Sequence, residues 1–145
     1  MTDSYPVLFE RALAQALETA GLGQYDLTEV YTAASATVAN PAILMGPNLP
    51  TTLDNCIVIT ALEPIPDGRA NILWRYQMLG RLKGTKAQIK NLAWNMRVAL
   101  DHKQNIPSGF DVSWSWVFSE LLFSPDSSGR QSFTQTVYFR GRRPL

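Results

Sequence analysis

Apolar residues repeat with a helical period near the start of the chain. Phe9, Leu13 and Leu17 recur every four residues within 5–20, so they fall on one face of a helix. Gly21 follows at the kind of position where glycine commonly ends a helix. The segment 5–20 is therefore predicted to be an amphipathic helix with one buried face.

A second helical pattern, the clearest in the chain, covers 85–102. Thr85 stands where an N-cap residue begins a helix. Lys86, Lys90 and Arg97 share a face beside the apolar stripe. The stripe, which we expect to pack on a sheet, consists of Ile89, Leu92, Ala93, Met96, Ala99 and Leu100.

Four further segments carry the patterns of β-strands. Residues 55–62 form a β-branched run typical of a buried strand, whereas 70–80 and the first part of 110–123 alternate large apolar residues with others. This alternation changes phase near Ser119–Glu120, which predicts a β-bulge there. Residues 131–140 predict a last strand, paired with the preceding one as a hairpin.

The strand predicted at 70–80 has two different faces. Because side chains alternate along a strand, bulky apolar residues point to one side and mainly polar residues to the other. The apolar face holds Ile72, Trp74, Tyr76 and Met78, and the polar face holds Arg69, Arg75, Gln77 and Arg81.

The remaining segments read as loops and turns. The proline-rich 40–52 predicts a long loop with at most a short strand at 42–45. The sequences EPIPDG at 63–68 and SPDSSG at 124–129 predict turns. The basic end, 141–145, is expected to be loose. The order helix, strand, strand, helix, strand, strand predicts one α+β domain over 1–145.

Composition excludes several classes of protein. The single cysteine leaves no internal disulfide. The N-terminal MTDSYPVLFERALAQ lacks the basic and apolar regions of a signal peptide, and no segment has the ~18–20 consecutive apolar residues of a membrane span. We therefore expect a protein made and used in a cytoplasm, or in something assembled there.

Charge divides the chain into two unlike halves. Residues 1–68 hold eight acids and one base, which gives −7, and residues 69–145 hold twelve bases and four acids, which gives +8. One interpretation is that the halves interleave in the fold and the charges cancel. The other is a monomer with an acidic and a basic face, which could pair head to tail and close a ring.

Candidate catalytic chemistry is sparse. His102 is the single histidine, at a helix end beside Asp101, and Cys56 lies in an apolar strand. A zinc site needs about four nitrogen or sulfur ligands, which one histidine and one cysteine cannot supply. The stretch 80–86 has glycines spaced too closely for a phosphate-binding P-loop, and its threonine precedes the lysine. The sequence predicts no enzyme and no cofactor or metal; a site assembled from dispersed acids stays an alternative.

The segment from Arg69 to Arg97 holds seven positive charges and no acid. It could contact the phosphates of a nucleic acid, with Trp94 stacking on a base. Alternatively, it is a solvated helix face that meets an acidic partner. Trp94 lies off the apolar stripe, on the side of the cations, so it is either an interface anchor or a core-edge residue.

The order of these features resembles the tail-terminator and minor capsid proteins of long-tailed bacteriophages. The resemblance rests on an opening helix ending in GLGQY, then PAILMGPNLP and CIVITALEPIPD, then RANILWRYQMLGRLKG running into TKAQIKNLAWNMRVALDH. The closing FSELLFSPDSSGRQSFTQTVYFRGR, a hairpin with a glycine-containing turn before a polar-aromatic strand, carries most of it.

The resemblance implies an α+β fold with a single mixed sheet of about four main strands and two helices. It also implies a homohexameric ring at the head–tail junction of a virion assembled in a bacterial cytoplasm. The expected partners are other copies of the chain, the tail tube protein and the head connector, with DNA passing through the ring. Another head-completion or minor capsid role is the alternative. The candidate interface residues are Trp94, Lys86, Lys90, Arg97, Arg140, Arg142 and Arg143.

Overall fold

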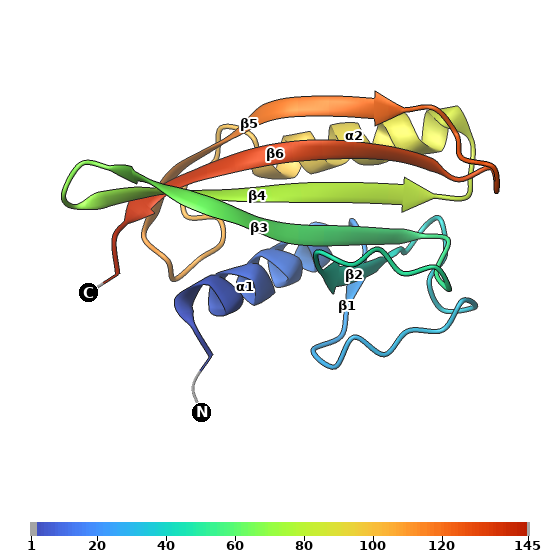
Figure 1. The fold of residues 1–145 in the computed structure, drawn as a ribbon, viewed down its shortest axis with the longest axis horizontal. Coiled ribbons are helices and arrows are strands. Elements are labelled where there is room, and N and C mark those ends of the chain that lie inside the picture. Colours follow the sequence, from blue (N-terminus) through green and yellow to red (C-terminus); the bar gives the residue numbers. More distant parts are fainter. Residues whose placement is uncertain (1–2, 145) are drawn as a thin grey trace.

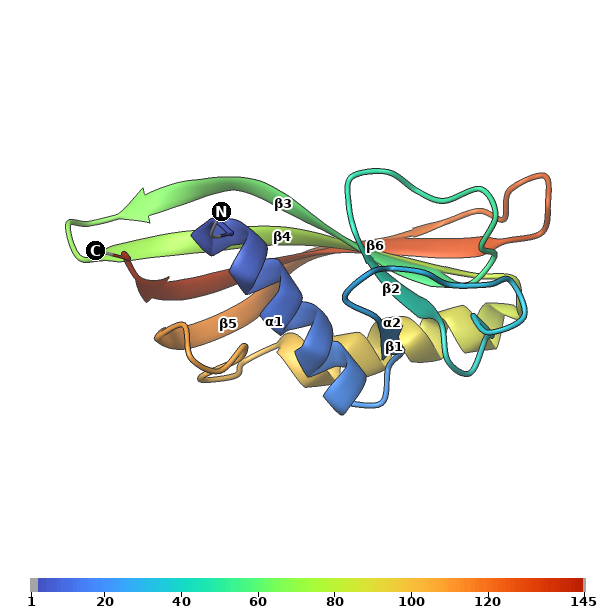
Figure 2. The same ribbon diagram turned by 90° about the horizontal axis from the view of Figure 1, so that it is seen from below.

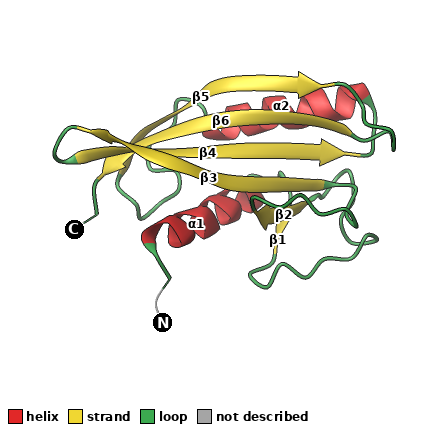
Figure 3. Cartoon of the chain, viewed as in Figure 1, coloured by secondary structure: helices red, strands yellow, loops and turns green. Residues whose placement is uncertain are grey.

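A computed structural model describes residues 3–144 as two helices and one six-stranded sheet (Figures 1 and 3). In chain order the elements are α1 (Tyr5–Thr19), β1 (Gln24–Tyr25), β2 (Ala42–Met45), β3 (Cys56–Asp67), β4 (Asn71–Leu82), α2 (Lys86–Leu100), β5 (Val112–Phe123) and β6 (Gln131–Arg142). The strands lie side by side in the order β1-β2-β3-β4-β6-β5.

The sheet is mixed and both helices cover the same face of it, as Figure 2 shows. β1, β2 and β3 pair in parallel, whereas β3-β4, β4-β6 and β6-β5 pair antiparallel. The α+β class, the two helices and the four main strands in one sheet are confirmed. The two short strands complete the sheet beyond β3, and β1 was not predicted.

α1 packs through the face that its sequence period predicts. Phe9, Leu13 and Leu17 have no solvent exposure. The Phe9 ring stacks on Tyr76 with centroids 5.0 Å apart and lies 5.3 Å from Phe139. This aromatic cluster fixes α1 across β4 and β6, because aromatic rings bury large areas in specific geometries.

α2 begins with a capping box. The Thr85 hydroxyl accepts the Gln88 N–H at 3.2 Å, and the Gln88 side chain accepts the Thr85 N–H at 2.8 Å. Thr85 as N-cap is thus confirmed. The expected stripe is buried against β4, β5 and β6, with Ala99 partly buried beside Ile89, Leu92, Ala93, Met96 and Leu100.

The turn expected at 63–68 is wrong, because β3 continues to Asp67 and the chain turns at 68–70. β2 pairs only with the first four residues of β3, so the rest of β3 is an outer strand on that side. Prolines are tolerated on outer strands and at irregularities. Pro64 lies in the register shift between Leu62 and Ile65, and Pro66 pairs with Ile72.

β5 has two irregularities, one more than predicted. Its register with β6 shifts between Val112 and Trp114 and again between Val117 and Ser119. The first shift turns Ser115 toward the helices, where its hydroxyl donates to the Leu100 carbonyl at 2.6 Å. As a result Trp114, Trp116 and Phe118 do not continue the core face that Val112 begins.

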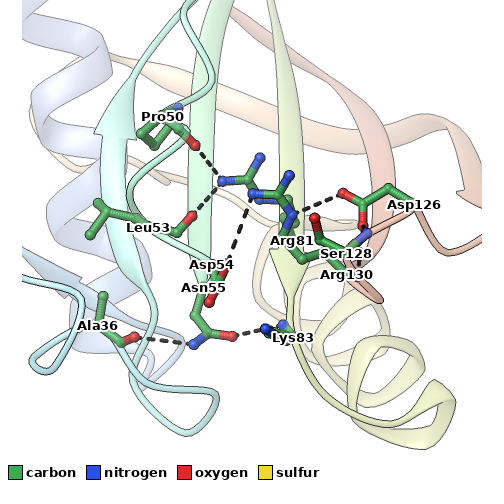
Figure 4. A network of polar contacts seen from close by, with 10 residues as sticks. All are labelled: Ala36, Pro50, Leu53, Asp54, Asn55, Arg81, Lys83, Asp126, Ser128 and Arg130. Carbon is green, nitrogen blue, oxygen red and sulfur yellow. Dashed lines mark hydrogen bonds and ion pairs between the residues drawn. The ribbon is translucent and has the colours of Figure 1, made fainter.

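Arg81 belongs to the polar face of β4 as predicted, yet it is only 5% exposed. The segment 46–55 crosses this end of the sheet, and the guanidinium donates to the carbonyls of Pro50 and Leu53 (Figure 4). Beside it, the Asn55 side chain donates to the Ala36 carbonyl at 3.1 Å and accepts the Lys83 N–H at 2.9 Å. The loop is thus pinned to the sheet.

The basic end of the chain is held more firmly than predicted. β6 extends to Arg142, and the Arg143 N–H donates to the Ala70 carbonyl at 2.7 Å. The expectation that looseness begins at residue 141 is therefore wrong, because 141–143 pair with the β3–β4 hairpin. Leu145 lies outside the described residues.

The two charge halves lie next to each other in the sheet. Residues 1–68 form α1 and the strands β1, β2 and β3, whereas residues 69–145 form β4, α2, β5 and β6. The boundary between the −7 and +8 halves runs between β3 and β4. The two halves therefore do not interleave, and the fold agrees with the interpretation that separates an acidic from a basic side.

Candidate protein-interaction surfaces

The outward face of α2 carries a large exposed aromatic side chain. Trp94 is 63% exposed and Val98, one turn further on, is 53% exposed. Lys90, one turn earlier, and Lys86 are also exposed, and neither forms an ion pair with a residue in 3–144. Trp94 is therefore a surface residue rather than part of the core edge.

Arg97 differs from the two lysines because it is neutralised within the chain. Its guanidinium lies 3.7 Å from Asp101 and 3.6 Å from Glu120. Glu120 also accepts the buried Gln135 amide at 2.6 Å. The structure brings Lys86 and Lys90 together on the surface, while Arg97 helps to fasten α2 to β5.

A groove lies between the first half of α2 and the end of β5. It has a volume of about 240 Å³, and Lys86, Ile89, Lys90, Leu122 and Phe123 line it. Leu122 and Phe123 are each 44% exposed. This β5–α2 groove therefore has both exposed apolar side chains and two lysines in its lining, at the edge of the sheet formed by β5.

The opposite edge of the molecule is acidic. The loop Asp26–Val30 follows β1, the other outer strand, and contains two acids, Asp26 and Glu29. It exposes Leu27 (61%) and Val30 (73%), which each directly follow one of these acids. Glu10 on α1 adds to this charge. Its pKa is raised by burial and, more weakly, by the nearby Glu29 carboxylate, while a hydrogen bond from the Ala61 backbone opposes the shift.

The predicted cations near the C-terminus cluster at the far end of the β3–β4 hairpin. Arg140 donates to Asp67 at 2.6 Å, so its charge is partly compensated. Arg142 and Arg143 are exposed and line a shallow hollow with Arg69. This group is separate from the α2 lysines by the length of β4, roughly 36 Å at ~3.3 Å per residue.

The sheet face away from the helices carries aromatic side chains of β5 and β6. Phe118, 61% exposed, stacks on Tyr138 with ring centroids 4.6 Å apart. Trp116 lies 5.5 Å from the same tyrosine, and Trp114 is 37% exposed. These rings form an apolar patch near the β5 edge.

The basic segment Arg69–Arg97 does not form one surface. Arg75 and Arg81 lie on the sheet face away from the helices, and Arg81 is buried, whereas Lys86 and Lys90 lie on α2 at the other face. A continuous row of phosphate contacts needs cations on a common face. The arrangement therefore disfavours the nucleic-acid alternative.

The candidate catalytic side chains lie apart from each other. Cys56 is buried, and burial raises the pKa of its thiol, against the weaker opposing effect of Arg81. Such a thiol is a poor nucleophile. His102 is exposed at the end of α2, 3.5 Å from Asp101. Within 3–144 no three histidine, cysteine or acidic residues group as metal ligands, and no helix is long and apolar enough to cross a membrane.

Sequence reasoning identified Trp94 and the two lysines but missed the apolar residues that accompany them. Leu122 and Phe123 stand in a strand that its pattern marked as half buried, and only the strand order makes β5 an outer strand. Leu27 and Val30 stand in a segment without a clear period. The acids next to them, Asp26 and Glu29, were the sequence feature that could have indicated a contact surface there.

Comparisons with known proteins support the architecture. No family model and no curated protein matches the sequence. A chain of the virion of a native gene transfer agent particle superposes with a TM-score of 0.65 at 14% sequence identity, covering 97% of this chain and 100% of that one. From end to end, this chain therefore has the fold of a protein of the gene transfer agent virion.

Proposed function

We propose that this chain is a structural component of a phage-like virion and acts as a tail terminator. The single observation that carries the proposal is the fold shared with a protein of a virion particle, over 97% of this chain and 100% of that one. The order of sequence features described above points independently to the same class. In this role the protein works by contact with other proteins and catalyses no reaction.

The charge arrangement supports assembly into a closed ring. A ring of identical subunits needs two different, complementary surfaces on each subunit. The acidic and basic halves lie on opposite sides of the β3–β4 boundary, so each subunit offers one of each sign. We propose a hexamer that caps the tail tube, meets the head connector and lets DNA pass through its centre.

Trp94 is the proposed anchor of a contact with a neighbouring copy or with another tail protein, with Lys86 and Lys90 beside it. Tryptophan is enriched among the few residues that contribute most to protein interfaces, and truncating such a residue costs ~2 kcal/mol or more. The lysines contribute mainly to orientation and to the rate of encounter. Arg97 supports the same face through its bonds to β5, and Arg140, Arg142 and Arg143 offer a second basic contact at the hairpin end.

Removal of the gene from a particle-producing cell tests the proposal. We expect the protein in purified wild-type particles, and without it we expect unjoined heads and tails of irregular length under the electron microscope. Trp94→Ala should fail to restore particles, whereas Trp114→Ala, which truncates another exposed tryptophan on the other sheet face, should restore them. Normal particles without the protein would refute the proposed role.

A further inference from the structure

We infer that neighbouring copies of this chain join when the loop Asp26–Val30 of one copy occupies the β5–α2 groove of the next. The inference rests on the proposed function, because it names the two surfaces that close the proposed ring. The sequence alone did not identify these two surfaces as partners. In the fold, the two surfaces match each other in position, in exposed apolar residues and in charge.

The loop is held in a fixed conformation. The Tyr31 hydroxyl donates to the Ile43 carbonyl at 2.7 Å and accepts the Asp26 N–H at 2.7 Å. The Glu29 carboxylate accepts the Met45 N–H. Leu27 and Val30 are thereby presented to solvent without the freedom of an ordinary loop. A prearranged loop loses little conformational entropy on binding, which favours its use as a contact.

The groove carries apolar side chains that can contact those of the loop. Leu122 and Phe123 in the lining of the groove offer apolar contacts for Leu27 and Val30, since all four side chains are at least 44% exposed in the single chain. Exposed apolar groups of this kind gain from mutual burial.

The charges of the two surfaces are complementary. Lys86 and Lys90 at the groove carry positive charge, and Asp26 and Glu29 in the loop carry negative charge. None of these four residues forms an ion pair with another residue of the described chain, 3–144. Two loops would repel each other, and so would two grooves, which disfavours a symmetric dimer through either surface.

The two surfaces lie at opposite edges of the molecule. The groove borders β5 and the loop follows β1, and these are the outermost strands of the sheet (Figure 1). A contact between opposite edges is head to tail, so each added copy leaves one free loop and one free groove. Such contacts continue until a ring closes or a filament forms.

Two single variants separate the surfaces. Phe123→Glu places an acid in the groove, and Val30→Glu places one in the loop. Each should weaken self-association at least about tenfold, because a charged group replaces an apolar side chain in the contact. The acid at position 123 would in addition face the acids of the loop. Phe118→Glu makes the same change on β5 outside the groove and should associate like the wild type. Thermal unfolding establishes that each variant is folded.

Mixing the variants is the decisive experiment. Phe123→Glu keeps an intact loop and Val30→Glu keeps an intact groove, so an equimolar mixture should form 1:1 dimers and stop there. Sedimentation velocity over a concentration series distinguishes these dimers from monomers and rings. Dimers that appear only in the mixture establish the contact. A mixture that stays monomeric, or single variants that associate like the wild type, overturns it.

A charge variant gives an independent readout. Lys86→Glu with Lys90→Glu should abolish association at low salt, whereas Arg142→Glu with Arg143→Glu, an equal change of charge at the hairpin end, should not. If the hairpin variant alone fails to associate, the ring closes elsewhere. A wild-type protein that is monomeric throughout also overturns this contact, while the particle experiment on the deleted gene decides the proposed function separately.

Discussion

At the scale of single residues, buried polar groups decide how the elements are joined. Gln135 is fully buried, and its amide donates to the Ala93 carbonyl at 2.7 Å and to Glu120 at 2.6 Å. Asp101 accepts the Val117 N–H at 2.8 Å. These bonds satisfy the Gln135 amide NH₂ group and the Val117 N–H, which would be costly to bury unpaired. They also set the position of α2 on β5 and β6.

Glu10 is expected to lower the stability of the protein at neutral pH. Its folded-state pKa is raised chiefly by burial, so the folded chain binds the proton more tightly than the unfolded chain, and stability falls as pH rises through the window between the two pKa values. Glu10→Gln should therefore raise the melting temperature at pH 7 and change it little at a pH below the ordinary glutamate pKa. Thermal melts at both pH values measure this. A variant less stable than the wild type at pH 7 would contradict the assignment.

Cys56 and His102 are expected to have no chemical role. Cys56→Ser should cost on the order of 1–2 kcal/mol of stability, because a hydroxyl replaces a buried thiol. His102→Ala changes an exposed side chain and should cost less. The infectivity of particles that contain either variant should match the wild type. Loss of infectivity with a folded, assembling variant would show that the replaced side chain has a chemical role.

Some residues could be placed from the sequence and others could not, for a physical reason. Phe9 and Leu92 were placed in the core because a helix has one period and one buried face. Arg81 was placed correctly on the polar face of β4, but its burial depends on a loop some 30 residues away in sequence. Local patterns carry no information on such crossings.

At the scale of elements, regular patterns predicted the four long strands and both helices, while irregularities decided the details. The first part of β5 reads as strict alternation up to a predicted bulge near Ser119–Glu120, but two register shifts occur, and they place Ser115 inside and Phe118 outside. β3 continues through two prolines because its second half lacks a neighbour on the β2 side. Pairing partners, which a single sequence does not reveal, determine whether such residues are tolerated.

Paired substitutions on α2 test its two faces. Leu92 is 8% exposed and packs on the sheet, whereas Trp94 is 63% exposed. Leu92→Asp should cost about 3 kcal/mol or more, because it buries an unpaired charge. Trp94→Asp should leave the melting temperature nearly unchanged while weakening assembly. Denaturant unfolding of both variants is the measurement. Equal destabilisation would mean that α2 does not pack by the face described.

At the scale of the whole molecule, the sheet separates an acidic half from a basic half and leaves apolar residues exposed at both outer edges. Head-to-tail contact between such subunits accounts for both features at once. It also predicts that association weakens with added salt, since exposed charges are screened over about 8 Å at physiological ionic strength. The sequence showed the charge split, but the strand order was needed to show that the halves do not interleave.

The proposed role requires that this protein form a ring within a virion. Cryo-electron microscopy of purified particles from cells that make the chain tests it most directly. We expect a closed ring at the junction of head and tail, into which the described fold fits, with the Asp26–Val30 loop of each copy against α2 and β5 of the next. Particles whose junction is complete and contains no density of this fold would refute the proposed role.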